Sequence, residues 1–268
     1  MRKTKIPTLI AIIFLVLGLA GGVYLVQQQQ IFRLSASPTY TPNDLRITNV
    51  TDSSFSVSWY TDTNTTAFIS LGQSPSLGTN YFESDTSSKR IHYITVDDLS
   101  PETTYYFSIT SAGDEFLNSG IPWSVTTAPT LSPRNSSEII SGQVFTKLNV
   151  PAVDVVVYAQ IGSAQLLSAK TSKSGNFLLP YNNVRDITLQ SYYEVEPNTS
   201  SIQLFVQGGP LGIANVQTYP AFTQPIPDII LGESYDYRES GETTRDTLPE
   251  AKIELPENFN QGSRFEID

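Results

Sequence analysis

The stretch LSPETTYYFSI, residues 99–109, decides the fold that we predict for this chain. Its first half has the composition of a turn, and its second half alternates, so that Tyr105, Phe107 and Ile109 fall on one face of a strand. The same alternation occurs upstream in FSVSW, residues 55–59. Short strands separated by turn residues, with no clear helical period in this part of the chain, predict an all-β protein built of sandwiches.

The run that ends at Tyr105 has the form L-x-P-x-T-x-Y and, with Trp59 in an earlier strand, resembles a fibronectin type III domain. In that family the tyrosine hydroxyl returns to the backbone and pins the link between the sheets. A finer resemblance rests on FISLGQSP, residues 68–75, and on His92 seven residues before the run. It is to the sandwich that precedes the catalytic domain of purple acid phosphatases. The resemblance covers residues 42–129 and implies the fold without the activity, because the metal ligands of those enzymes belong to the following domain and no such motif follows here.

A second β-rich block follows the first domain, which we place at residues 43–129. Residues 130–137, TLSPRNSS, predict a linker, and residues 138–233 predict a second sandwich. Later strands of this block are expected at residues 187–193, 201–206, 213–219 and 229–231.

The first part of this block carries a resemblance of its own. SGQV at residues 141–144, PAVDV at residues 151–155 and TSKSGNF at residues 171–177 resemble the opening strand, the next strand and the hairpin of a carboxypeptidase regulatory-like (prealbumin-type) domain. Ser172 stands where that hairpin usually has an aspartate. The resemblance implies a sandwich over residues 138–233.

The N-terminus predicts the topology. Residues 1–5 carry three basic side chains, and residues 6–26, IPTLIAIIFLVLGLAGGVYLV, are uncharged. A helix of this length is about 31 Å long, which matches a hydrocarbon core of about 30 Å. The basic flank predicts a cytoplasmic N-terminus, a single transmembrane signal-anchor and an extracytoplasmic remainder joined through a linker at residues 27–42.

A cleaved signal peptide is the competing interpretation. Gly18 and Ala20 are small enough for a cleavage site, but they lie inside the apolar run. The apolar part of a signal peptide usually has only about 7–15 residues, so the length favours an uncleaved anchor in the bilayer. Both interpretations place the remaining chain outside the cell membrane.

Composition excludes several classes of function. The chain has no cysteine, which excludes disulfides and thiol catalysis, and it has a single histidine. Its formal net charge is −10, and all 26 acidic residues follow the predicted span. An acidic surface argues against nucleic acid as a partner. Residues 234–268 hold nine acids and four bases without an apolar period, and they predict a disordered acidic tail.

The chain carries no recognisable catalytic motif. It lacks a G-x-S-x-G elbow, a phosphate-binding loop and an H-E-x-x-H helix. His92 shares strand parity with core residues and is expected to be buried. Asp97 and Asp98 are adjacent, so their side chains point to opposite faces, and Asp62 lies in a segment without the glycine and glutamate of a calcium loop. We therefore predict no catalytic residue, no cofactor and no metal ligand.

Exposed aromatic side chains are the remaining candidates for binding, since aromatic platforms bind sugars and proteins. Strand parity suggests Tyr60, Tyr81, Phe82, Tyr158 and one of Tyr192 and Tyr193. The predicted function is a non-enzymatic membrane protein that presents tandem sandwiches for adhesion, scaffolding or binding of a protein or glycan. The alternative is an accessory subunit of an envelope-bound enzyme or secretion complex.

Overall fold

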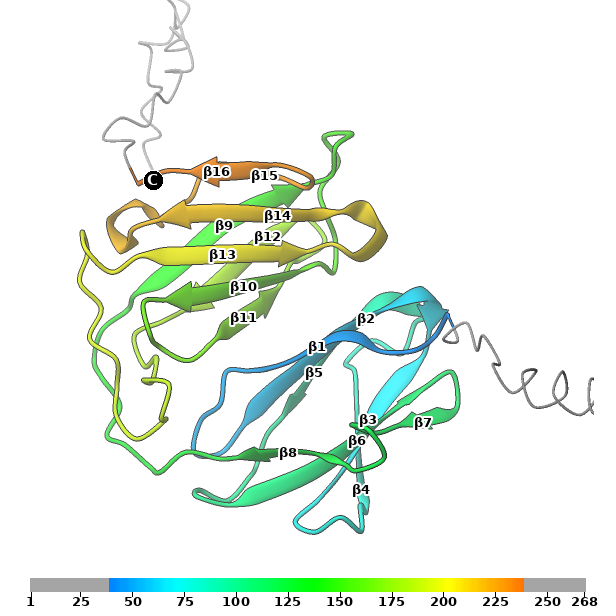
Figure 1. Ribbon diagram of the computed structural model, residues 1–268. Coiled ribbons are helices and arrows are strands. Elements are labelled where there is room, and N and C mark those ends of the chain that lie inside the picture. Colours follow the sequence, from blue (N-terminus) through cyan, green and yellow to red (C-terminus); the bar gives the residue numbers. More distant parts are fainter. Residues whose placement is uncertain (1–38, 239–268) are drawn as a thin grey trace, which may run out of the picture. The chain divides into compact units, whose positions relative to one another are not determined.

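The computed structural model describes residues 39–238 (Figure 1). They form two compact units, one of residues 39–47 and 51–128 and the other of residues 48–50 and 129–238. Strands dominate both units, and the described helices are two short 3-10 turns, η1 (Gly209–Leu211) and η2 (Pro220–Phe222). The all-β prediction is confirmed.

The predicted membrane span at residues 6–26 lies outside the described residues, as do most of the linker at 27–42 and of the tail at 234–268. Within residues 39–238, no helix has the length and apolar character needed to cross a membrane.

The first unit consists of two sheets. One has three strands in the order β1-β2-β5, and the other has the order β4-β3-β6-β7, with β8 also paired to β6. Strands β7 and β8 pair with successive parts of β6, at Ile109–Ser111 and at Thr104–Phe107. The strands are β1 (Asn43–Thr48), β2 (Phe55–Thr65), β3 (Ala67–Gly72), β4 (Thr79–Phe82), β5 (Lys89–Val96), β6 (Thr104–Ser111), β7 (Asp114–Phe116) and β8 (Trp123–Thr126).

The predicted alternation explains the core of the first unit. Tyr105, Phe107 and Ile109 of β6 are all buried, and the rings of Phe55 and Phe107 meet between the two sheets with centroids 6.1 Å apart. The Ser100 N–H donates a hydrogen bond of 2.9 Å to the Tyr105 hydroxyl. This bond is the tyrosine corner that the fibronectin type III resemblance implies.

The second unit is also made of two sheets. The larger has the order β11-β10-β13-β14-β16 and the smaller has the order β12-β9-β15. Most pairs are antiparallel, but β15 runs parallel to β9 and β16 runs parallel to β14. The strands are β9 (Ile139–Phe145), β10 (Val156–Ile161), β11 (Leu167–Lys170), β12 (Asn176–Pro180), β13 (Ile202–Gln207), β14 (Ile213–Thr218), β15 (Ile229–Ile230) and β16 (Ser234–Asp236).

The turn predicted at residues 171–177 is present, but it links β11 of the larger sheet to β12 of the smaller sheet, so the two strands do not pair as the predicted hairpin. The Ser172 N–H donates to the Asn176 carbonyl at 2.8 Å, and the Gly175 N–H donates to the Ser172 carbonyl at 2.9 Å. Gly175 has a φ of +77°. A Cβ at this position would lie 2.5 Å from the Val144 carbonyl oxygen, so the turn needs a glycine.

Two further sequence predictions for the second unit are wrong. Residues 187–193 were expected to form a strand but form turns, because the Asp186 carboxylate accepts hydrogen bonds from Thr188 and Ser191 and so stabilises a turn instead of a ladder. The expected start of a disordered tail at residue 234 is also wrong, since β16 pairs with β14 as far as Asp236.

Candidate functional site

The first unit has a small pocket between β3, β4 and the end of β6. Register explains its composition, because Phe68 of β3 lies opposite both Phe82 of β4 and Thr110 of β6. The two rings are 5.2 Å apart between centroids, and Phe82 is 61% exposed. The pocket has a volume of about 330 Å³ and is also lined by Glu83 and Asp85. We call this site the aromatic pocket.

A buried polar cluster adjoins the aromatic pocket through Glu83. His92 of β5 lies with its Nε2 2.9 Å from the Thr65 Oγ1 and its Nδ1 3.4 Å from the Glu83 Oε2. The other carboxylate oxygen of Glu83 accepts a hydrogen bond of 2.8 Å from the Tyr93 N–H. The Lys89 Nζ lies 3.4 Å from the same Oε2 that faces His92. One carboxylate thus holds an imidazole, an ammonium and a backbone amide.

The order hydroxyl, imidazole, carboxylate is that of a nucleophile activated by a general base. The surroundings oppose such a role, because His92 is 0% exposed and Thr65 is 4% exposed. The imidazole is also stacked on the Trp59 ring, with centroids 5.1 Å apart. Thr65 and His92 are thus shielded from solvent and bound to one another and to Glu83, which is the arrangement of a structural cluster. The predicted burial of His92 is confirmed.

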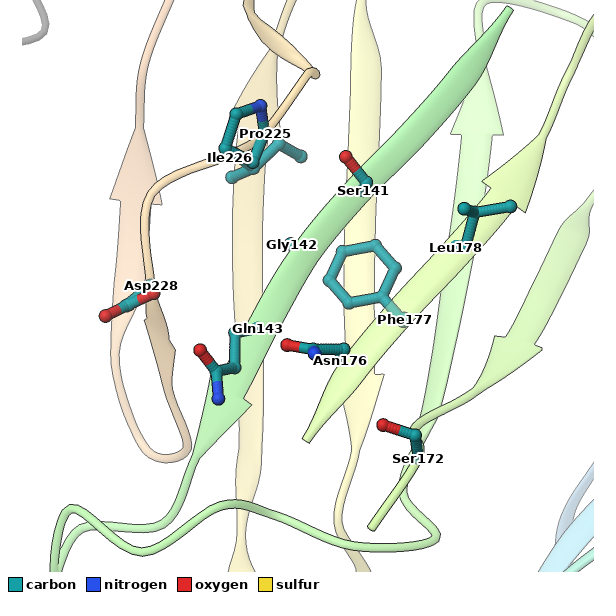
Figure 2. Close-up of a pocket in the computed structure, with 10 residues that line it drawn as sticks. All are labelled: Ser141, Gly142, Gln143, Ser172, Asn176, Phe177, Leu178, Pro225, Ile226 and Asp228. Atoms are coloured by element: carbon teal, nitrogen blue, oxygen red, sulfur yellow. The ribbon is translucent and has the colours of Figure 1, made fainter. Parts of the chain in front are cut away.

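The second unit has a wider and more polar concavity, shown in Figure 2, with a volume of about 550 Å³. Ser141 and Gln143 from β9 and Asn176 and Leu178 from β12 line it, and Asp228 lies across from them in the segment before β15. We call this site the polar pocket. Its hydroxyl, amide and carboxylate groups suit a ligand rich in hydrogen-bonding groups.

A glycine shapes the floor of the polar pocket. Phe177 lies opposite Gly142 in the register of β12 and β9, and its ring packs over the glycine (Figure 2). A Cβ on Gly142 would lie 3.0 Å from the Phe177 Cε1. Several polar groups already have local partners, since the Gln143 Nε2 donates to the Ser174 carbonyl at 2.6 Å and the Asn176 Nδ2 to the Ser174 hydroxyl at 3.1 Å. These bonds orient the amides at the rim.

The acidic residues considered from sequence do not converge on a site. Asp97, Asp98 and Asp62 are all exposed. Within residues 39–238, no group of three or more histidine, aspartate or glutamate side chains is arranged to hold a metal ion.

The aromatic side chains that the sequence predicted to be exposed are exposed in some cases and buried in others. Phe82 is exposed, as expected, but Tyr158 is only 2% exposed, so its prediction as a surface residue is wrong. Tyr158 stacks on Phe205 of the neighbouring strand, with centroids 6.0 Å apart. Tyr192 is half-buried beneath the guanidinium groups of Arg134 and Arg185, at 4.9 and 5.7 Å from the ring centroid.

Sequence reasoning missed Phe68 as a partner of Phe82. The signal was present, because the alternation that places Ile69 and Leu71 in the core directs Phe68 outward. What the sequence did not provide is the register that sets Phe68 opposite Phe82.

Comparisons with known proteins support a fibronectin type III-like sandwich at the N-terminal side of the chain. Residues 42–130 match the family model of the purple acid phosphatase N-terminal domain. No curated protein matches the chain. The carboxypeptidase regulatory-like interpretation of residues 138–233 has no support among these comparisons and stays a prediction.

Two solved structures are similar over part of the chain. The FN1–FN3 domains of chicken CNTN1 are 15% identical, with 62% of this chain and 58% of that chain covered and a TM-score of 0.26. The central fibronectin-III array of RIM-binding protein is 16% identical, with 65% and 60% covered and a TM-score of 0.25. The matches span less than two thirds of either structure's length.

Proposed function

We propose that this chain is a non-enzymatic binding or scaffolding protein that uses the aromatic pocket of its first unit to hold a protein partner. The observation that carries the proposal is the exposed Phe82 ring, supported from beside by Phe68 and bordered by Glu83 and Asp85. Aromatic side chains in pockets are common anchors of protein interfaces, and the exposed Asp85 carboxylate at the border favours a partner with a basic group.

The sequence supports a membrane location for this function. Residues 6–26 are proposed to anchor the chain, with residues 1–5 in the cytoplasm and both sandwiches on the extracytoplasmic side. Protease added to spheroplasts should then degrade the sandwiches from outside. Protection of the sandwiches in intact spheroplasts would contradict this location.

The binding proposal is tested by affinity capture of the full chain from detergent-solubilised membranes. We expect one stoichiometric partner with the natural chain and at least a tenfold lower yield with Phe82→Asp, because a charge replaces the anchor ring. The matched control is Ile121→Asp, since Ile121 is 65% exposed in the same unit but does not line the pocket.

If Phe82→Asp and Ile121→Asp capture equal amounts of the partner, the aromatic pocket is not the binding site. Hydrolysis of phosphate or ester substrates by the repurified full chain would contradict the non-enzymatic part. The polar pocket supplies the glycan alternative, which glycan-array binding that is lost with Asp228→Asn would support.

A second candidate function is an accessory subunit of an envelope-bound enzyme. The match of residues 42–130 to a domain of a phosphatase family favours it, because that domain accompanies a catalytic domain that this chain does not resemble. A captured partner with hydrolase activity would favour this candidate over adhesion.

A further inference from the structure

Several loops of the second unit converge at one end of its sandwich, and Figure 1 shows the connections β9–β10 and β13–β14 at that end. The register requires it, because Val156 at the start of β10 lies opposite Lys170 and Gln207, and Gln207 lies opposite Ile213. We call residues 146–155, 171–175, 208–213 and 231–233 together the loop end.

The loop end carries most of the exposed aliphatic side chains of the described structure. Residues 39–238 contain nine exposed large hydrophobic side chains, and five of them are Leu148, Val150, Val153, Leu211 and Ile213. Leu148 is the most exposed, at 86%. Single exposed aliphatic residues are ordinary, but a group at the tips of neighbouring loops marks a surface that something covers.

The same end carries basic charge in an otherwise acidic protein. The three lysines of residues 129–238 are Lys147, Lys170 and Lys173, and all three lie in or next to these loops. Two carboxylates lie at the same end: Asp154 pairs with Lys170 at 2.9 Å, and Glu233 accepts a hydrogen bond from Tyr235 at 2.7 Å. The three lysines therefore exceed the carboxylates there by one charge. Lys147 and Lys173 are exposed beside the aliphatic tips.

The composition of the loop end distinguishes between possible occupants. It contains no Trp, Tyr, Phe or Arg, which are the side chains that usually anchor protein interfaces. Aliphatic loop tips flanked by lysines suit binding to an anionic bilayer. The aliphatic side chains enter the boundary between the headgroups and the acyl chains, and the ammonium groups contact the lipid phosphates.

We propose that the loop end of the second unit docks on an anionic lipid bilayer, with Leu148, Val150 and Leu211 inserted and Lys147 and Lys173 at the headgroups. The docking does not require the anchor at residues 6–26, although a tether to the same membrane would raise the local concentration of the loop end.

The absence of cysteine makes a direct test possible, because a single introduced cysteine takes a fluorescent label specifically. The full chains Leu148→Cys and Ile187→Cys are labelled and reconstituted into vesicles that contain nitroxide-labelled lipid. Ile187 is a matched control, being 70% exposed near a bridge between Asp186 and Ala164 at the other end of β10. One set of vesicles contains phosphatidylglycerol and the other only phosphatidylcholine.

We expect lipid quenching of the label in Leu148→Cys in the anionic vesicles, little in the neutral ones, and none for Ile187→Cys. Adding Lys147→Gln and Lys173→Gln should weaken the docking about fivefold for each lysine. Equal quenching at both positions, or none for Leu148→Cys in anionic vesicles, would overturn the proposal. So would shielding of the Leu148→Cys label from aqueous iodide without lipid quenching, because a protein surface then covers the loops.

Alkaline carbonate extraction separates this proposal from the membrane anchor. A chain that resists extraction but shows no quenching for Leu148→Cys keeps the anchor and refutes the docking. A chain that carbonate releases refutes the anchor. Its docking is then read from co-sedimentation with added phosphatidylglycerol vesicles, which Leu148→Asp should abolish and Ile187→Asp should not.

Discussion

In the first unit, ionisable side chains are buried between the sheets, whereas the second unit fills its interior mainly with aliphatic ones. Glu83 and His92 are buried in the first unit, with Lys89 beside them. Among the described residues of the second unit, the one buried side chain of the Asp, Glu, His, Lys and Arg types is Arg185, whose guanidinium donates to the Leu189 carbonyl at 3.0 Å.

This difference shows that one architecture can be stabilised in two ways. The first unit depends on charges that compensate one another in a site from which water is excluded, so the loss of one partner leaves another uncompensated. The second unit depends on close packing and on turn geometry, so added or removed volume matters most. Changes aimed at each unit test this contrast.

The largest expected effect is at Trp59. Its ring is 1% exposed and stacks on His92, so Trp59→Ala removes a large apolar contact and the aromatic ring that covers the buried imidazole. We expect a loss of about 3–5 kcal/mol in the free energy of unfolding of the first unit. Urea unfolding followed by the fluorescence of Trp123, which lies in the same unit, measures it. A loss below about 1 kcal/mol would contradict the core role of Trp59.

Glu83→Ala should have the next largest effect. It leaves the Tyr93 N–H without its acceptor and removes the carboxylate beside Lys89 and His92. We expect a loss of about 2–3 kcal/mol in the first unit, read from tryptophan fluorescence during urea unfolding. Asp85→Ala is the control, because Asp85 lies 3.9 Å from the same lysine with a side chain that is 56% exposed, and its loss should cost little.

In the second unit the matching test is Gly175→Ala. Gly175 has a φ of +77°, and a Cβ there would lie 2.5 Å from the Val144 carbonyl oxygen. We expect a loss of about 2 kcal/mol, detected as faster amide hydrogen exchange in β9 and β12. Gly113→Ala separates strain from collision, since Gly113 has a φ of +92° with no atom within 4 Å of a Cβ. Equal losses at both glycines would show that the collision is unimportant.

The sequence predicted those features that depend on local pattern. The burial of His92 follows from alternation, and the turn closed by Gly175 follows from turn residues close together in the chain. The tyrosine corner at Tyr105 is what the resemblance of residues 99–105 to fibronectin type III domains implies. Local information was sufficient there because each feature involves at most a few neighbouring residues.

The features that the sequence did not predict depend on long-range pairing. The aromatic pocket needs Phe68 and Phe82 in register, and the polar cluster needs Glu83 to reach His92 after the turn that follows β4. Tyr158 was expected on the surface because β10 was expected to have a solvent-exposed face, yet Val156 and Tyr158 are both buried. Neither register nor the covering of a second face is encoded in the alternation of one strand.

The smallest expected effects concern two tyrosines, one in each unit, whose hydroxyls make the same kind of hydrogen bond to the backbone of their own unit. The Tyr105 hydroxyl accepts from the Ser100 N–H at 2.9 Å, and the Tyr235 hydroxyl accepts from the Ile230 N–H at 3.0 Å, so in both units the tie spans five residues. Replacing either tyrosine by phenylalanine should cost its unit about 1 kcal/mol at neutral pH.

The pKa values of these tyrosines shift in opposite directions. Burial raises the pKa of Tyr105, but the hydrogen bonds from Ser100 and Gln73 outweigh it and leave the pKa below the usual 10.0. Burial, together with the hydrogen bond to Glu233, raises the pKa of Tyr235 above 10.0.

The opposite shifts predict opposite alkaline behaviour. A lowered pKa contributes stability above the unfolded value of about 10 and loses it as the pH falls through the folded pKa, so Tyr105 stabilises the first unit as the pH rises. A raised pKa contributes stability below about 10 and loses it as the pH rises through the folded pKa, so Tyr235 makes the second unit alkali-sensitive. We therefore expect the first unit of the natural chain to gain stability above pH 10, and Tyr105→Phe to remove this gain. Urea unfolding followed by tryptophan fluorescence on both sides of pH 10 measures it. The second unit of the natural chain should lose stability above pH 10, and Tyr235→Phe should remove this loss, as measured by amide hydrogen exchange in β14 and β16. If stability depends on pH equally in the variants and in the natural chain, other groups cause the alkaline response.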